Sequence, residues 1–301
     1  MNSAISKRET FISYFLAVAL ILGMVAAALL FNDREIILPE IAAMAIGVWV
    51  YREAGWIRQP SKLFIAPSLT AIIGFAVNQL DIAYLAKVSL TLALMMLSLR
   101  IIRSNLAPSI ATGLLPLVTN ATEWSFVLSV LVFTFILMLG VLLFRLNEGL
   151  EKKVPINYKY MLVFLVISFV WMGACTLAGF PQASVIPPIL VVVYESLQKP
   201  MYNGKMAFKQ ALVLTISATV GTLLYYAIDS WIIVTMLDII CMLILLRIVG
   251  IRVPAVFAFP LLPFVFPEEV VAVLPLVALI ATTCLFGMVL AYKKWEFKQT
   301  H

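Results

Sequence analysis

Two ionisable side chains lie inside long apolar stretches of this 301-residue chain, and they are the first candidates for chemistry. Asp238 is in the middle of the stretch from Trp231 to Arg247, and Lys87 lies one turn from Thr91, the residue that aligns with Asp238. In a membrane helix such a charge costs about 2.5–3.5 kcal/mol on insertion scales, which makes both residues functional candidates. Three interpretations stay open: a buried ion pair; a proton on Asp238 and an anion drawn to Lys87; or a snorkelling Lys87 with Asp238 as a protonated packing residue.

Polar groups of the short proline-led segments, together with hydroxyls in two of the long apolar runs, form a second set of candidates. Glu40 follows Pro39 in the first turn of a predicted helix, where the helix dipole stabilises a carboxylate, so it is either a cap or an acid that faces a cavity. Helical hydroxyls often bond back to their own backbone. Here several recur at matched positions of the two halves, which favours a role as solute ligands. These residues are Ser68 and Thr70, matched by Thr215 and Ser217, together with Ser109, Thr112, Thr119 and Asn120.

Four arginines, Arg100, Arg103, Arg247 and Arg252, come just before two of the proline-led segments. One interpretation is that they anchor the topology of the chain. The other is a guanidinium cluster that attracts an anionic solute to an inner vestibule, because guanidinium groups bind carboxylates and oxyanions in a bidentate manner.

The remaining reactive residues argue against an enzyme, a metal site and a bound cofactor. His301 is the single histidine and is terminal, and the sequence contains no phosphate-binding glycine loop, HExxH motif or serine–histidine arrangement. Cys175, Cys241 and Cys284 lie in apolar runs, as expected of packing residues. The net charge of +6 does not indicate nucleic-acid binding, because the basic residues are spread among short loops. No ring-forming filter sequence indicates a channel.

The composition predicts an all-α polytopic membrane protein. Hydrophobic residues make up 63% of the chain and charged residues 12%, whereas soluble domains have an apolar share of about 45–50%. Long apolar runs lie near 11–31, 62–79, 82–101, 124–145, 160–180, 209–227, 230–248 and 269–292. Membrane lipids are therefore expected partners, and a homodimer is left open.

A short proline-led segment occurs four times, near 37–51, 106–119, 184–197 and 253–266. Proline suits the first turn of a helix, where its missing N–H would be unpaired anyway, so each copy is predicted to start a short helix. The first and third prolines, Pro39 and Pro187, are 148 residues apart, and the second and fourth, Pro108 and Pro254, are 146 apart. This spacing predicts two six-helix transmembrane repeats, 1–150 and 151–301.

The basic residues decide how many segments cross the membrane. If all twelve runs cross and the N-terminus is cytoplasmic, 19 of the 21 lysines and arginines fall on the inner side, as the positive-inside bias requires. With ten crossings the basic residues divide about evenly between the two sides. The sequence therefore predicts twelve helices in the cytoplasmic (inner) membrane, with both termini inside.

The order within each half is long, short and long, repeated twice, so each half contains two three-helix units. Because three is an odd number of crossings, successive units are inverted, whereas the two halves are parallel. Inverted pairs nested in a parallel pair are typical of secondary transporters, whose short or broken helices offer their ends to the solute near the midplane. The expected function is secondary transport of a small solute, with an anion as the first candidate. The alternative is a non-transporting membrane protein that binds a lipid or a protein partner.

The residues of each half also resemble a known family. A short helix beginning Pro-x-x-Ala, a basic loop, a helix ending in Arg100 and the stretch LAPSIATG from Leu106 to Gly113 resemble the HPP family of integral membrane proteins. Pro108, Ala111 and Thr112 match that family's signature His-Pro-Pro-Gly-Gly-Ala-Thr-Ala, whereas the namesake His-Pro-Pro is not kept. The family includes proteins described as nitrite transporters, so the resemblance implies a transporter class.

Overall fold

The computed structural model describes residues 7–152 and 156–300, and this part of the chain contains helices and turns without a strand. Lys153 and His301 lie outside the described residues. Among the described helices, eight are long and apolar enough to cross a membrane, which confirms the prediction of an all-helical multi-pass membrane protein. They are α1 (Lys7–Phe31), α4 (Pro60–Asn78), α5 (Tyr84–Ile101), α7 (Trp124–Leu143), α8 (Lys159–Leu177), α10 (Gly204–Ala227), α11 (Trp231–Val249) and α13 (Glu268–Thr300).

A proline begins each of the four short segments, as the sequence predicts. The first is α2 (Pro39–Ala45), which continues into a widened turn, η2 (Ile46–Val50). The second and third are α6 (Pro108–Val118) and α9 (Pro187–Gln198). The connecting helical turns are η1 (Arg34–Ile36), α3 (Ala54–Ile57) and η3 (Pro181–Ser184).

The fourth segment differs from the continuous short helix that the sequence predicts. It consists of two tight turns, η4 (Pro254–Phe257) and η5 (Phe259–Leu261), followed by one turn of α-helix, α12 (Leu262–Val265). Pro260 and Pro263 lack the N–H needed for helix hydrogen bonds, and a proline ring clashes with the preceding turn. The two internal prolines therefore break the segment.

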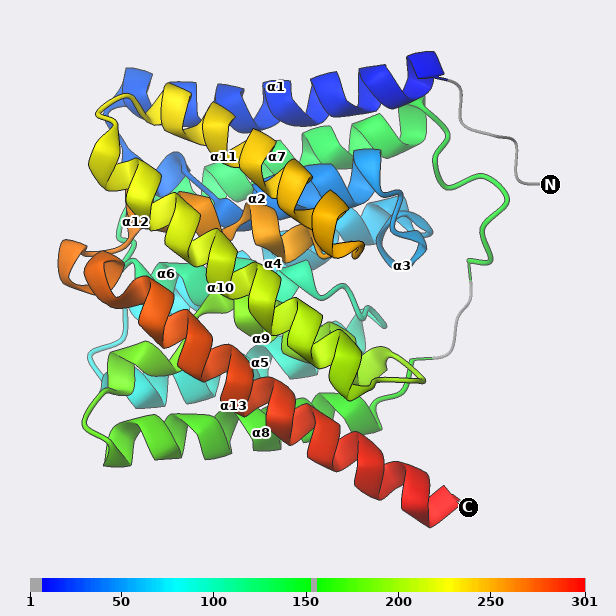
Figure 1. Cartoon of the computed structure of the whole chain (residues 1–301), viewed down its shortest axis with the longest axis vertical. Helices are drawn as coiled ribbons and strands as arrows, with labels where there is room; N and C mark the ends of the chain where they lie inside the picture. The colour runs from blue at the N-terminus through cyan, green and yellow to red at the C-terminus, as the bar shows by residue number, and fades with distance from the viewer. Residues whose placement is uncertain (1–6, 153–155, 301) are drawn as a thin grey trace.

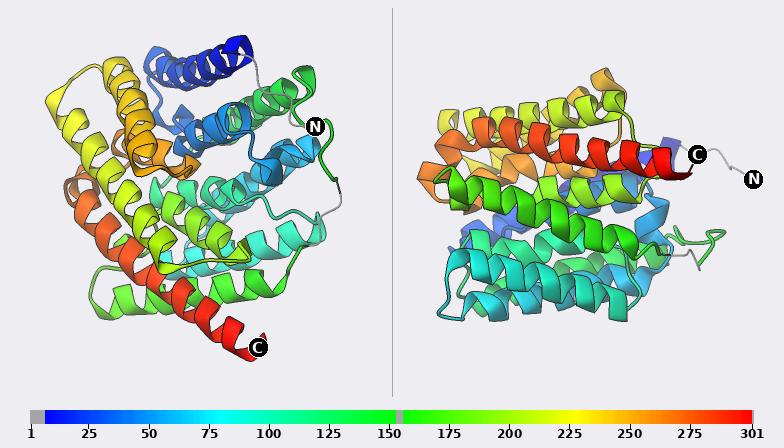
Figure 2. Two further views of the ribbon diagram at one scale, coloured as in Figure 1. Left: turned by 45° about the vertical axis from the view of Figure 1, so that its right-hand side comes forward. Right: turned by 90° about the horizontal axis from the view of Figure 1, so that it is seen from below.

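The four short segments form the buried centre of the molecule. All residues of α2 are buried, as are residues 108–117 and 254–264. The segments also pack on one another, α6 against α9 and α2 against η4, with further contacts from α2 to α6 and from α9 to η4. The long helices surround this centre (Figures 1 and 2) and expose large apolar side chains such as Phe11, Leu162 and Leu177, as expected of helices that face lipid.

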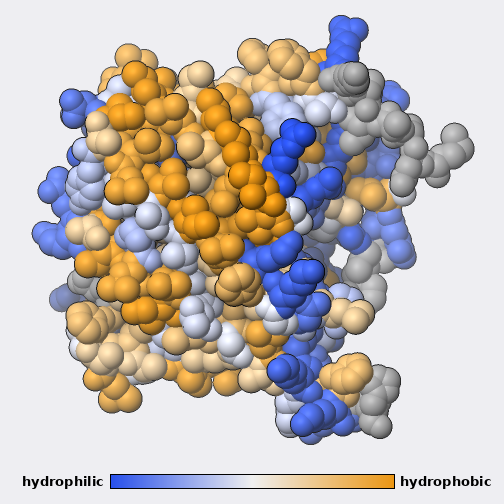
Figure 3. Space-filling model, in the orientation of Figure 1, coloured by the Kyte–Doolittle hydropathy of each residue, from blue (hydrophilic) through white to orange (hydrophobic). Residues whose placement is uncertain are grey.

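The described structure has two polar ends. At the end where α1 begins and α13 finishes, here called the basic end, Arg52 pairs with Glu9 at 3.8 Å, Lys159 pairs with Glu296 at 2.9 Å, and Lys62 donates to the Arg103 carbonyl. At the opposite end, the Glu35 carboxylate accepts hydrogen bonds from the backbone N–H groups of 122 and 123. In Figure 3 hydrophilic residues gather at both ends, most densely along the right-hand edge, and hydrophobic residues cover the band between them. This arrangement suits a protein that crosses a bilayer.

Two close backbone contacts join a long helix to a short segment. A Cβ atom on Gly74 of α4 would lie 1.9 Å from the Gly113 carbonyl oxygen of α6, and a Cβ on Gly221 of α10 would lie 2.4 Å from Cα of Pro260 in η5. Both distances are far below van der Waals contact, so glycine is required at both positions. Gly221 and Pro260 each lie 147 residues after their counterparts, Gly74 and Gly113.

Candidate functional site

A cavity of about 660 Å³ lies at the end opposite the basic end, between elements of the two halves of the chain. The first half contributes the end of α4, the start of α5 and the end of α6, whereas the second half contributes the segment from α8 to α9 and the first turns of α13. We call it the outer cavity. The lining residues used below are Asn78, Tyr84, Lys87, Leu117, Val118, Asn120, Phe180, Val185, Ile186, Phe266, Glu269 and Leu274.

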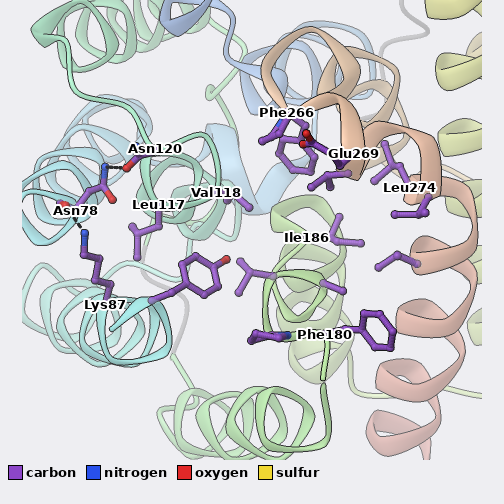
Figure 4. A pocket seen from close by; sticks show the side chains of 18 of the residues that line it. Asn78, Lys87, Leu117, Val118, Asn120, Phe180, Ile186, Phe266, Glu269 and Leu274 are labelled. Carbon is purple, nitrogen blue, oxygen red and sulfur yellow. Dashed lines mark hydrogen bonds between the residues drawn. The ribbon is translucent and has the colours of Figure 1, made fainter. Parts of the chain in front are cut away.

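The first half supplies a polar wall to the outer cavity. The Lys87 ammonium donates a hydrogen bond to the Asn78 carbonyl at 2.7 Å. The Asn78 side-chain amide donates to Oδ1 of Asn120 at 3.4 Å (Figure 4) and also to the Ala121 carbonyl at 2.9 Å. The Tyr84 hydroxyl is buried without a hydrogen-bond partner among the described residues. An ammonium group has three N–H donors, so Lys87 can still donate to a solute.

The second half supplies an apolar wall. Phe180, Ile186 and Leu274 lie across the cavity from Lys87, and the exposed Glu269 lies at one side of it (Figure 4). A site with one polar wall and one apolar wall suits a small amphipathic solute.

In the second half, the residues that lie 147 positions after those of the polar wall have aromatic and aliphatic side chains. Tyr225 corresponds to Asn78, Trp231 to Tyr84, and Val234 to Lys87. The Trp231 ring stacks on Phe264 with centroids 4.9 Å apart, and the Arg34 guanidinium lies 5.3 Å from the Trp231 ring centroid. Aromatic packing thus occupies the place of the polar wall in the second half.

A smaller cavity of about 180 Å³ lies at the basic end, where all four short segments meet. We call it the basic-end pocket. Glu53 lies between η2 and α3, Asn105 and Ala107 precede α6, Glu195 lies in the last turn of α9, and Arg252 precedes η4. The other lining residues are Gly55, Trp56, Tyr194, Gln198, Lys199 and Pro254. Burial raises the pKa of the Glu53 carboxyl, and the charges of Lys199 and Arg252 oppose part of that rise.

Lys87 and Asp238 do not form the ion pair considered from the sequence. Lys87 lines the outer cavity, whereas Asp238 is 2% exposed and lies beside Ile21 of α1 and Phe257 of η4. Neither Asp238 oxygen has a hydrogen-bond partner among the described residues. Glu40 is 3% exposed, its Oε1 also lacks a partner, and it lines neither the outer cavity nor the basic-end pocket.

Of the polar side chains predicted as solute ligands, Asn120 lines the outer cavity, whereas the hydroxyl groups line neither the outer cavity nor the basic-end pocket. The Thr70 and Thr112 hydroxyls are 2.9 Å apart between α4 and α6, and the Ser217 hydroxyl donates to the Val256 carbonyl at 2.6 Å. Ser68 bonds back to its own helix. Thr119 does so too, and the buried hydroxyls of Ser109 and Thr215 lack a described partner. The hydroxyls of Thr70 and Ser217, which lie at matched positions of the two halves, thus both form contacts between a long helix and a short segment.

The four arginines do not form one cluster. The Arg100 guanidinium lies 5.4 Å from the Tyr158 ring centroid, and Arg103 lines a basic crevice with Arg58 and Lys152. Arg247 and Arg252 line a cavity of about 680 Å³ between α1 and α11. Of the four, Arg252 also reaches the basic-end pocket.

Sequence reasoning missed Asn78, Tyr84, Glu53 and Glu195. Each lies within or next to the first or last turn of a helix, where polar side chains are common at the surface of a membrane protein. For Glu53 and Glu195 the signal that could have found them is their position near the ends of short segments, which are expected to meet. Asn78 and Tyr84 lie at the ends of the long helices α4 and α5, and no such signal marks them.

Comparisons of the chain with protein-family models, with curated proteins and with solved structures gave no match. The resemblance to the HPP family therefore stays a prediction from the quoted residues.

Proposed function

We propose that this protein is a secondary transporter that moves a small amphipathic organic anion between its two halves, along the contact of α6 with α9. The observation that carries the proposal is that the outer cavity and the basic-end pocket lie at opposite ends of this one helix pair. Leu117 and Val118 end α6 at the outer cavity, and Ala107 precedes α6 at the pocket. Ile186 precedes α9 at the outer cavity, and Glu195 lies near its other end.

The packed centre between the two cavities supports alternating access. Residues 108–117 of α6 and 187–194 of α9 are all buried, so a solute in one cavity has no described opening to the other. A channel would need a continuous path, whereas a transporter needs a closed centre that opens to one side at a time.

The proposed architecture is twelve crossings in two parallel six-helix repeats, each built of two inverted three-helix units. The matched contacts support it: Gly74 against Gly113 repeats as Gly221 against Pro260. The Lys62 ammonium donates to the Arg103 carbonyl just after the end of α5, and the Lys209 ammonium donates to the carbonyl of Val249, the last residue of α11. The positive-inside bias then puts the basic end and both termini in the cytoplasm.

The outer cavity supports the solute class. Lys87 offers a cation and Asn78 and Asn120 add polar atoms on one wall, so a carboxylate or sulfonate fits there. The apolar wall around Ile186 and Leu274 fits a short hydrocarbon tail.

The test is uptake into liposomes that contain the purified protein. Labelled hexanesulfonate and benzenesulfonate serve as probes, because sulfonates stay ionised and do not cross lipid as neutral acids. We expect saturable uptake of both above that of protein-free liposomes, and weak uptake of sulfate and nitrite, which lack an apolar part. Uptake of nitrite alone would contradict the solute class. Absence of uptake for every anion, with tight binding of a lipid, would favour the non-transporting alternative.

A further inference from the structure

Asp238 lies at the other interface between the two halves, away from the outer cavity. It belongs to α11, which packs on α1, α10, η4 and η5. The outer cavity is instead formed by α4, α5, α6 and α13 with the segment that precedes α9. The two interfaces are equivalent under the proposed repeat but carry different chemistry.

The Asp238 side chain lines a narrow space just large enough for about one water molecule. The cavity measures about 10 Å³ and is lined by apolar side chains of α1, α11, η4 and η5, apart from Asp238 and Thr235. The Thr235 hydroxyl donates to the Trp231 carbonyl at 2.7 Å, and both carboxyl oxygens of Asp238 lack a hydrogen-bond partner among the described residues. An ionised carboxylate in such surroundings is costly, whereas a neutral carboxylic acid is tolerated.

No other titratable side chain lines this cavity among the described residues. The thiol of Cys241 lies one turn after Asp238 on α11 and does not line the cavity. The elements packed around the cavity carry their other titratable groups toward their ends, and η4 and η5 carry none. Those groups are Lys7, Arg8, Glu9 and Tyr14 of α1; Lys205, Lys209, Tyr225 and Tyr226 of α10; and Arg247 of α11. The protonation of Asp238 is therefore set by burial and by the access of water.

The donor set suits a proton better than a metal cation. Sodium and divalent ions of the hard class need several oxygen ligands, and Asp238 and Thr235 are the oxygen-bearing side chains among the residues that line the cavity. A proton needs one carboxyl oxygen and a path to water. Of the elements that line this space, α1 belongs to the first half and α11, η4 and η5 to the second, so a rocking of the halves would open it to one side of the membrane.

We propose that Asp238 is the proton-binding site that couples solute movement to a proton gradient, with the solute and the proton held at separate interfaces. This inference rests on the proposed transport function. Glu40, a second buried acid, lies in α2, which packs on η4 and η5.

Infrared difference spectroscopy of the purified protein tests the site without any solute. We expect a band of a protonated carboxylic acid at neutral pH that is missing from Asp238→Asn and present in the matched control Asp229→Asn, whose aspartate is exposed just before the same helix begins. Spectra of wild type and Asp238→Asn that do not differ in this band would overturn the proposal.

Liposomes loaded with hexanesulfonate test the coupling. For one proton per solute, a pH gradient of one unit is expected to drive accumulation of up to about tenfold. Asp238→Asn is expected to lose this accumulation and keep exchange of internal for external hexanesulfonate, whereas Asp229→Asn keeps both. If Asp238→Asn also loses exchange, recovery of accumulation in Asp238→Glu supports the proposal, and failure to recover overturns it.

Accumulation that is equal in wild type and Asp238→Asn would overturn the coupling role. If wild-type protein transports no probe anion while the infrared band of Asp238 is present, the proton site is supported and the proposed transport function fails.

Discussion

Replacing Gly74 with alanine is expected to destabilise the protein by about 1–3 kcal/mol, the usual cost of forcing extra atoms into a packed core. The new Cβ would lie 1.9 Å from the Gly113 carbonyl oxygen and 2.8 Å from its carbonyl carbon. Both are backbone atoms, so α4 and α6 would have to move apart. Gly221→Ala is expected to have a similar effect, because its Cβ would lie 2.4 Å from Cα of Pro260. Thermal unfolding in detergent measures both.

The matched control is Gly23→Ala in the long helix α1, where an added Cβ would meet nothing within 4 Å. Alanine has the higher helix propensity by up to about 1 kcal/mol, so this variant is expected to be as stable as wild type or more so. Equal melting temperatures for Gly74→Ala and Gly23→Ala would contradict the close packing of α4 on α6.

Lys87→Met is expected to weaken hexanesulfonate uptake by raising KM about 10- to 150-fold. A hydrogen bond to a charged group contributes about 1.5–3 kcal/mol, and each 1.4 kcal/mol is about tenfold in affinity. Methionine has a similar length but carries neither the charge nor a donor. The KM of liposome uptake gives the result.

Two variants separate solute binding from structure in this experiment. Lys87 also donates to the Asn78 carbonyl at the end of α4, so its loss could loosen that helix end. Lys87→Arg keeps a cationic donor and is expected to retain most uptake, whereas Lys294→Met removes an exposed charge near the basic end and is expected to leave KM unchanged. A KM for Lys87→Met equal to that of wild type would exclude Lys87 from the binding site.

The sequence predicts the helices well because the signals are local. Apolar runs and the prolines at 39, 108, 187 and 254 mark where helices begin, and the structure begins them there. The break in the fourth segment could also have been predicted, because Pro260 and Pro263 are visible in the sequence. The alternation of long and short apolar runs instead led to the prediction of a continuous short helix.

The site is less predictable because it depends on which helix faces meet. Lys87 and Asn120 were found as candidates and line the outer cavity, but Lys87 and Asp238 align closely along the repeat and yet belong to different interfaces. The matched hydroxyls of Thr70 and Ser217 mark packing between helices. Only the packing of α5, α6, α9 and α13 shows that Tyr84 and Asn78 share a cavity with Ile186.

The most direct test of alternating access is the reactivity of single cysteines at the two ends of α6. In a chain with Cys175, Cys241 and Cys284 replaced by alanine, Val118→Cys reports on the outer cavity and Asn105→Cys on the basic-end pocket. A membrane-impermeant maleimide is applied from the matching side of the membrane, with and without hexanesulfonate. Alternating access predicts that the solute changes the two labelling rates in opposite directions, one rising as the other falls. Rates that stay constant, or that rise or fall together, would contradict transport along the contact of α6 with α9.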